Sequence, residues 1–239
     1  MKTTPNGWKV IDEDAGILSY EYRFATAGFA NAIAARMANG EMMVISPPSR
    51  VSAGVFDDLE PYGKVGAVVA NNGFHHLGLP SWKDRFPEAR FFAEDTAARR
   101  IKKKNSKAPD FESTDALKEI SGDDVVFTAL SPTKCGEGWL KAKTSDGYVW
   151  FTSDILHNMD KLPANFLVRT LFKMTGTRPG FGVFHAAMMV LVKDKKGVLR
   201  NMRDDLSAHP PSVIVPGHGA ILTDASVGKM AQDVLNKAL

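Results

Sequence analysis

The chain has 239 residues, of which 44% are hydrophobic and 24% are charged, as is typical of a globular protein rather than a disordered or collagen-like one. The net charge of +3 does not indicate a nucleic-acid partner, and no stretch approaches the ~20 apolar residues of a membrane-spanning helix. A single cysteine excludes an intrachain disulfide and a zinc site built from several cysteines. A metal would therefore depend on the six histidines and on carboxylates.

The first residues and a local cluster of basic residues bear on the compartment and on possible partners. Residues 1–8 lack the apolar core of a signal peptide, so we expect a cytoplasmic protein with a reduced cysteine. Six basic residues fall between positions 99 and 107 without interleaved aromatic residues. We interpret them as a solvated helix end and loop, with an anionic partner as the alternative.

The first third of the chain favours strands. Alternating apolar residues predict a strand over 17–24. Two more strands, over 32–37 and 42–46, flank Asn39-Gly40, and both of these turn residues accept the positive φ of a tight hairpin. Apolar residues four positions apart predict a short helix over 51–59.

Strands and helices then alternate. A continuous apolar run predicts a buried strand over 65–70, followed by a helix over 79–85 and a short strand over 90–93. A further helix begins near residue 95, and the polar residues 104–122 are expected to form an irregular surface excursion.

The second half is expected to begin with three strands and then to be mostly helical, with one further strand between the helices. The predicted strands cover 125–130, 139–143, 148–152 and 212–215, and the apolar stripes of the predicted helices lie at 166–171, 198–206 and 227–235. Strands interspersed with helices along the whole length predict one layered α/β domain over residues 1–239.

Three predicted strands are followed at once by polar residues that bind metals. His75-His76 follows the strand over 65–70, Asp154 follows the strand over 148–152, and His218 follows the strand over 212–215. Functional side chains are commonly set on loops at strand ends. Imidazole and carboxylate suit zinc, iron and manganese.

The order of these segments resembles the metallo-β-lactamase superfamily. That family's first motif, His-x-His-x-Asp-His, is matched by the stretch Asn71 to His76, and its bridging Asp by Asp154 in the stretch Phe151 to Leu156. Its last metal-binding His often lies in Pro-Gly-His-Gly, which is found here at 216–219. Its middle His corresponds to the region of Cys135.

The resemblance implies a fold and a reduced metal site. The implied fold is α/β, a four-layer αββα sandwich with the site at one edge of two facing sheets. The family's first metal position is dismantled, because Asn71, Gly73 and about Cys135 stand where it carries His. The second position keeps a ligand throughout, so the resemblance implies one divalent ion held by His75, His76, Asp154 and His218.

The identity and role of that ion stay open. Zinc is favoured, with iron or manganese as alternatives. Four protein ligands are typical of a closed structural zinc, whereas a five- or six-coordinate ion leaves room for water or substrate. Asp154 has a second interpretation, as the N-cap of a helix beginning at Ile155.

The resemblance favours a metal-dependent hydrolase of an ester, lactone or related small substrate, acting through a metal-bound water that Asp154 ligates and orients. One alternative is a non-catalytic ligand-binding or sensor protein with a structural metal or none. Another is a mononuclear iron redox protein. The expected partner is a small-molecule substrate, with no nucleic acid or membrane, and a homodimer is allowed.

Several residues are expected near the site. We interpret His157 as a surface or second-layer residue, and His185 as a core residue or part of the pocket roof. Arg178, in a possible lid over 162–184, would suit an anionic substrate. Cys135 is either an inert side chain or a ligand. Core or pocket-wall positions are expected for the aromatic residues Trp139, Trp150, Phe166 and Phe172.

Overall fold

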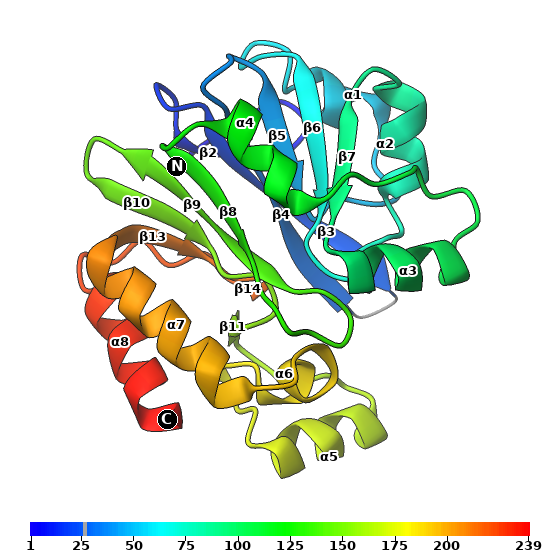
Figure 1. Ribbon diagram of the computed structural model, residues 1–239. Helices are drawn as coiled ribbons and strands as arrows, with labels where there is room; N and C mark the ends of the chain where they lie inside the picture. Colours follow the sequence, from blue (N-terminus) through cyan, green and yellow to red (C-terminus); the bar gives the residue numbers. More distant parts are fainter. Residues whose placement is uncertain (26–27) are drawn as a thin grey trace.

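The computed structural model describes residues 1–25 and 28–239, and its first half is built on a seven-stranded sheet (Figure 1). The strands lie side by side in chain order: β1 (Lys2–Thr3), β2 (Lys9–Asp12), β3 (Ile17–Ala25), β4 (Gly28–Arg36), β5 (Met42–Ile45), β6 (Val65–Ala70) and β7 (Arg90–Ala93). β1 to β5 pair antiparallel, and β5, β6 and β7 pair parallel. The predicted hairpin is confirmed, with Gly40 in its turn at φ +82°.

The second half forms two smaller sheets. One contains β13 (Pro211–Val215), β10 (Gly147–Phe151), β9 (Gly138–Thr144) and β8 (Val125–Ala129), in that order. The other contains β12 (Gly180–Val183), β11 (Leu156–Met159) and β14 (His218–Gly219). Within the first of these, β10 pairs parallel with β13, which brings the ends of these two strands together at one edge.

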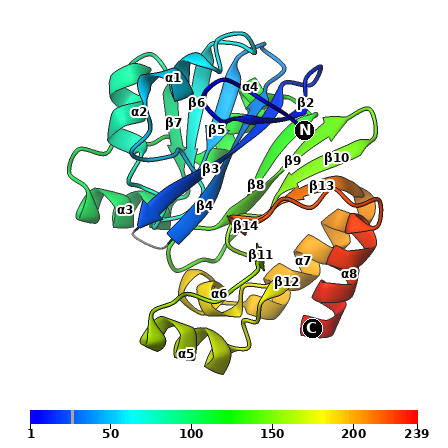
Figure 2. The same cartoon turned by 180° about the vertical axis from the view of Figure 1, so that it is seen from behind.

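Helices cover both outer faces of the two larger sheets (Figures 1 and 2). Buried residues of α1 (Ala53–Asp57), α2 (Leu79–Arg85) and α3 (Asp95–Lys104) pack on the seven-stranded sheet. Those of α6 (His185–Leu191), α7 (Lys195–Ala208) and α8 (Val227–Ala238) pack with β9, β10 and β13 on the other side.

A third apolar cluster fills the space between the sheets. Ile33, Ile45 and Val69 of the first sheet pack against Leu140 and Val149 of the second, and all five are fully buried. Two facing sheets with helices outside are the four-layer αββα sandwich that the resemblance implied, and burial of apolar surface on both faces of each sheet stabilises it.

The structure corrects several local predictions. Residues 104–122 contain a 3₁₀ helix (Thr114–Leu117) and α4 (Lys118–Ser121). Asp154 does not cap a helix, because a turn and then the strand β11 follow it. The short strands β11, β12 and β14 were not predicted. Trp139 and Trp150 are buried core residues, as expected.

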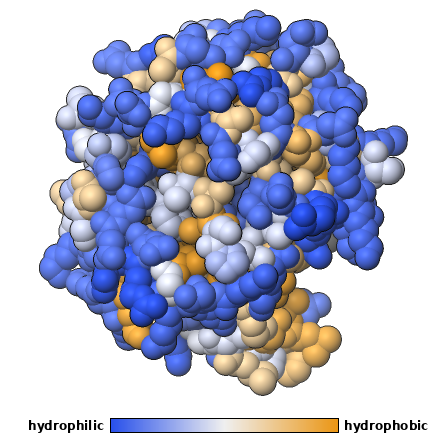
Figure 3. Space-filling view, viewed as in Figure 1, coloured by the Kyte–Doolittle hydropathy of each residue, from blue (hydrophilic) through white to orange (hydrophobic). Residues whose placement is uncertain are grey.

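α5 (Phe166–Thr175) is a helix as predicted, but its apolar stripe is not core. Phe166 is 68% exposed and Leu167 75% exposed, and α5 contains no buried residue. Figure 3 shows the resulting apolar surface over α5, at the lower right. Phe172 is half-buried against Phe184, with ring centroids 5.2 Å apart. No helix in the described part of the chain is long and apolar enough to span a membrane.

Asn31, in the middle of β4, ties the first sheet to the loop that carries His218. Its amide Nδ2 donates to the carbonyls of Pro216 and Gly219, each at 2.8 Å, and its backbone N donates to Gly217 O at 2.8 Å. The side chain is only 2% exposed, so these carbonyls have little access to water that could replace it.

Replacing Asn31 with Ala should therefore lower the free energy of unfolding by about 2 kcal/mol, because one buried and one partly buried acceptor lose their donor. Urea denaturation of Asn31→Ala measures this, with Asn201→Ala as a control at an exposed position of α7. Equal stabilities of the two variants would contradict the role given to Asn31.

Candidate metal centre

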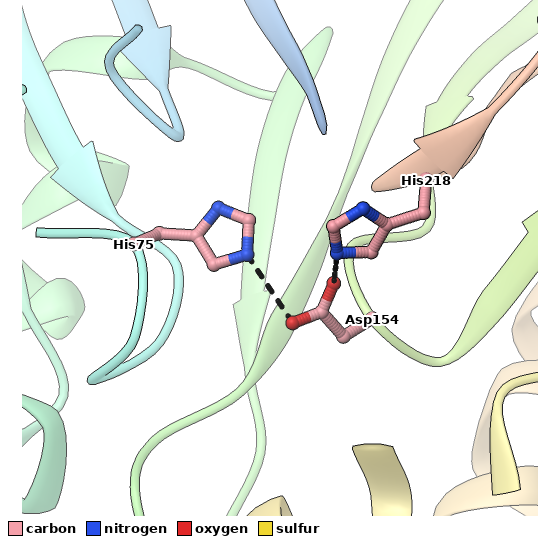
Figure 4. A group of neighbouring side chains, drawn as sticks. All are labelled: His75, Asp154 and His218. Atoms are coloured by element: carbon pink, nitrogen blue, oxygen red, sulfur yellow. Dashed lines mark hydrogen bonds and ion pairs between the residues drawn. The ribbon is translucent and has the colours of Figure 1, made fainter. Parts of the chain in front are cut away.

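Three residues from distant parts of the chain meet at the sheet edge. His75 lies in the loop after β6, Asp154 in the turn after β10, and His218 at the start of β14 after β13. Their potential ligand atoms all lie within 4.8 Å of one another. As Figure 4 shows, both imidazoles point toward the carboxylate: His75 Nε2 is 3.2 Å from Oδ2, and His218 Nε2 is 3.3 Å from Oδ1.

Hydrogen bonds on the far side of each ring fix its orientation. His218 Nδ1 donates to the carbonyl of Phe29 at 2.6 Å, so in the neutral ring the lone pair belongs to Nε2, which faces Asp154. His75 Nδ1 lies 2.6 Å from Ser46 Oγ, and that hydroxyl also contacts the Tyr22 hydroxyl at 3.1 Å. An outer hydrogen bond of this kind is typical of metal-binding histidines.

Asp154 is a buried anion balanced by its two neighbours. Burial by itself raises the pKa of a carboxyl, but the imidazoles of His75 and His218 outweigh it and hold the pKa of Asp154 well below its usual range. Burial likewise lowers the pKa of His218, yet the Asp154 carboxylate raises it overall. Oδ1 of Asp154 is buried and, within the described residues, has the ion pair with His218 Nε2 but no hydrogen-bond donor. Two imidazole nitrogens and an unsatisfied carboxylate oxygen match the donor set of Zn²⁺, Fe²⁺ or Mn²⁺.

Two residues beside the centre adopt the left-handed conformation although they are not glycines. Ser153, which precedes Asp154, has φ +49°, and Ser46, which contacts His75, has φ +57°. Such conformations are uncommon for residues with a Cβ, and they cluster at functional sites where the surrounding structure enforces them. Here each one aims a loop at the centre.

Sequence reasoning missed Asn72 and Glu137. Asn72 Nδ2 donates to Asp154 Oδ2 at 3.0 Å and to Glu137 Oε2 at 3.2 Å, and both residues are buried. Burial, followed by the charge of Asp154, raises the pKa of Glu137 well above its usual range. A carboxyl between two glycines, directly before an apolar strand, was the signal that could have identified Glu137.

His76, predicted as a ligand, does not join this group. Its neighbours are Arg100, Lys104 and His75, and these charges, after burial, lower its pKa. Its Nδ1 is buried without a hydrogen-bond partner. The group therefore contains two histidines and one aspartate. His75 and His76 are consecutive in the sequence, but only His75 contacts Asp154.

Asn71, Gly73 and Cys135, which stand at the first metal position of the resembled family, lie in closely packed surroundings. A Cβ at Gly73 would lie 2.6 Å from Arg100 Cδ and 3.0 Å from Cys135 O. Asn71 donates from Nδ2 to Ser153 Oγ, a close contact. Cys135 is buried, and its Sγ lies 3.9 Å from Val190 O, outside the group of three.

The other predicted neighbours line a separate cavity. His157, Arg178 and His185 lie together around a hollow of about 280 Å³ that none of the three grouped residues lines. His157 is buried rather than at the surface, being 1% exposed. Burial first, then the charges of His218 and His185, lower the pKa of His157 to about 4.

The three grouped residues themselves lie at a smaller cavity of about 130 Å³. Its remaining walls are mostly apolar and include Tyr22, Phe24, Phe74 and Leu77. An apolar pocket with a few convergent polar groups is the usual form of a small-molecule site.

The lowered pKa of His157 predicts an acid-sensitive fold. In the unfolded chain His157 binds a proton near pH 6.5, whereas in the folded chain it does so only near pH 4. The free energy of unfolding therefore falls as the pH falls from about 6.5 to about 4. At about 1.4 kcal/mol per unit of pKa, the loss is on the order of 3 kcal/mol. Denaturation at pH 7 and pH 4 should show a smaller loss for His157→Gln than for the wild type, and an identical loss would contradict this assignment.

Comparison with known proteins agrees with the architecture. The chain matches no protein-family model and no curated protein sequence. Solved structures of the DIM-1 metallo-β-lactamase match it over 100% of both chains, with a TM-score of 0.60 at 12% identity for one of them. The metallo-β-lactamase FIM-1 from Pseudomonas aeruginosa, in its mono-zinc form, matches over 100% of this chain and 98% of its own, with a TM-score of 0.55 at 10% identity. The chain therefore has the metallo-β-lactamase fold.

Proposed function

We propose that this protein is a metal-dependent hydrolase of a small ester or lactone, with one divalent ion held by His75, Asp154 and His218. The observation that carries the proposal is the convergence of two imidazole Nε2 atoms and a buried, unsatisfied carboxylate oxygen at an apolar cavity. The metallo-β-lactamase fold, and the mono-zinc form of one solved relative in fold, agree with it.

The packing around the first position of the resembled family supports a single ion. Arg100 and the Cys135 backbone occupy the space that a side chain at position 73 would need, and Asn71 is engaged with Ser153. At the remaining position, three protein ligands are fewer than a closed tetrahedral zinc site requires. This count supports a catalytic role over a purely structural one, because it leaves a coordination position for water or substrate.

Different residues would supply charge, orient the ligands and contact the substrate. Asp154 supplies the negative charge, while the Phe29 carbonyl and Ser46 keep the two imidazoles in place, and Asn72 orients the carboxylate. The apolar walls Phe24, Phe74 and Leu77 suit the hydrocarbon part of a substrate and restrict water around it. A bound divalent ion would polarise the substrate carbonyl and lower the pKa of water toward neutrality.

The same donor set favours a second candidate. Two histidines and one carboxylate with open positions are also the ligands of mononuclear non-haem iron proteins. Iron as the metal of the purified protein, together with inactivity toward esters and lactones, would select this candidate.

The ligand assignment predicts which histidines the metal needs. His75→Ala and His218→Ala should each remove a first ligand and lower metal affinity by more than about 100-fold, since even outer partners of ligands contribute about 10–100-fold. Competition with a chromophoric chelator measures this affinity. His76→Ala is the matched control and should bind metal as the wild type does; equal losses in all three variants would show that the assignment is wrong.

The catalytic proposal predicts the effect of neutralising Asp154. Asp154→Asn keeps the shape of the side chain but removes its charge, and kcat should fall by more than about 100-fold. The measurement is turnover of a panel of esters and lactones by metal-loaded protein, with Asp123→Asn as a control at an exposed position. A wild type that hydrolyses none of the panel, or an Asp154→Asn variant of full activity, would argue against hydrolysis at this centre.

A further inference from the structure

The separate cavity near α5 and β12 is lined by nitrogen-bearing side chains. It is bordered by His157, Arg178, His185 and Lys237, and none of the described residues that line it carries a carboxylate side chain. None of them belongs to the proposed metal centre. The segment 176–182 supplies one wall, and the end of α8 supplies the opposite one.

The two permanent cations of this cavity have no anionic partner. Within residues 1–25 and 28–239, neither Arg178 nor Lys237 forms a salt bridge, although twelve such contacts exist elsewhere. Two unpaired cations beside one hollow raise the local concentration of anions.

His157 adds a buried donor to the same wall. The backbone N–H of Met159 donates to its Nδ1 at 3.4 Å, which places the proton of the neutral ring on Nε2. That N–H donates to no acceptor in the described part of the chain. It lies beside Gly182, another wall residue, where an added Cβ would be 3.9 Å from Nε2. It is therefore free to donate to an acceptor on a ligand in the cavity.

We propose that this cavity binds a small anion, through a carboxylate or phosphate group carried on an apolar body. Arg178 offers a planar pair of donors that matches either group, Lys237 adds a second charge, and His157 donates from the buried end. Phe181 and Val234 on the wall provide contacts for the apolar part.

The proposed anion site adjoins the proposed metal centre. His157 and His218 are partners in the parallel pairing of β11 and β14. The Phe184 ring contacts both of them, with centroid distances of 5.4 Å to His157 and 5.6 Å to His218. An anion bound at His157 is thus separated from a proposed metal ligand by one aromatic side chain.

Nuclear magnetic resonance titration of the full chain tests the proposal with three probes: benzoate, inorganic phosphate and the neutral benzamide. Saturable shifts of the His157 ring and the Gly182 amide at millimolar benzoate or phosphate are expected, and the probe that binds identifies the anionic group. Arg178→Gln and Lys237→Gln should each weaken binding about tenfold, because each removes a charge-assisted hydrogen bond.

Lys229→Gln is the matched control, since Lys229 lies on the same helix but pairs with Asp233 away from the cavity. It should leave binding unchanged. Benzamide binding as tightly as benzoate, equal effects of Arg178→Gln and Lys229→Gln, or no saturable shift at His157 would each overturn the proposal. Because the titration needs neither metal nor turnover, its failure is distinct from failure of the proposed hydrolase.

Discussion

The edge of the molecule that carries the candidate site is organised around one interaction. The buried carboxylate of Asp154 lies between the imidazoles of His75 and His218 and pairs with both. A buried anion is strongly unfavourable unless cations or donors compensate it. In the protein alone, the two neighbouring imidazoles supply that compensation. A divalent cation supplies it more completely, because it can interact with both neutral Nε2 atoms and with the carboxylate oxygen that accepts no hydrogen bond.

The fold places the two imidazoles beside the carboxylate because the ends of three strands, β6, β10 and β13, meet at one edge. The parallel pairing of β10 with β13 sets Asp154 beside the loop that carries His218, and Asn31 of the other sheet fixes that loop from the opposite side. Left-handed backbone at Ser153 then turns Asp154 toward the two rings. Function at this edge therefore depends on residues that never touch the centre as well as on those that form it.

The sequence predicted most of the regular structure because the spacing of apolar residues differs between helices and strands. The helix over 79–85 and the strand over 90–93 match the observed bounds, and the turn at Asn39-Gly40 was identified from its residues. The strand β14 escaped prediction because it has only two residues, and β11 because His157 and Asn158 interrupt its apolar residues. In α5 the stripe predicted the helix correctly, but periodicity does not tell whether a partner covers it.

The candidate site was predicted in part for a similar reason. Motif position identified His75, Asp154 and His218, yet it also selected His76, because a motif does not reveal which way a loop side chain points. Glu137 and Asn72 were missed because their role depends on contacts across 65 positions of sequence. Arg178 and His185 were expected near the metal and instead line the neighbouring cavity.

We propose that one divalent ion is held by three protein ligands alone, His75, Asp154 and His218. A crystal structure of protein prepared without chelator, with diffraction measured at the absorption edge of its metal, tests this most directly. We expect one anomalous peak, bonded to Nε2 of His75, Nε2 of His218 and the carboxylate of Asp154. A peak coordinated by His76, a second peak near Asn71 and Cys135, or metal-loaded protein without a peak at Asp154 would contradict it.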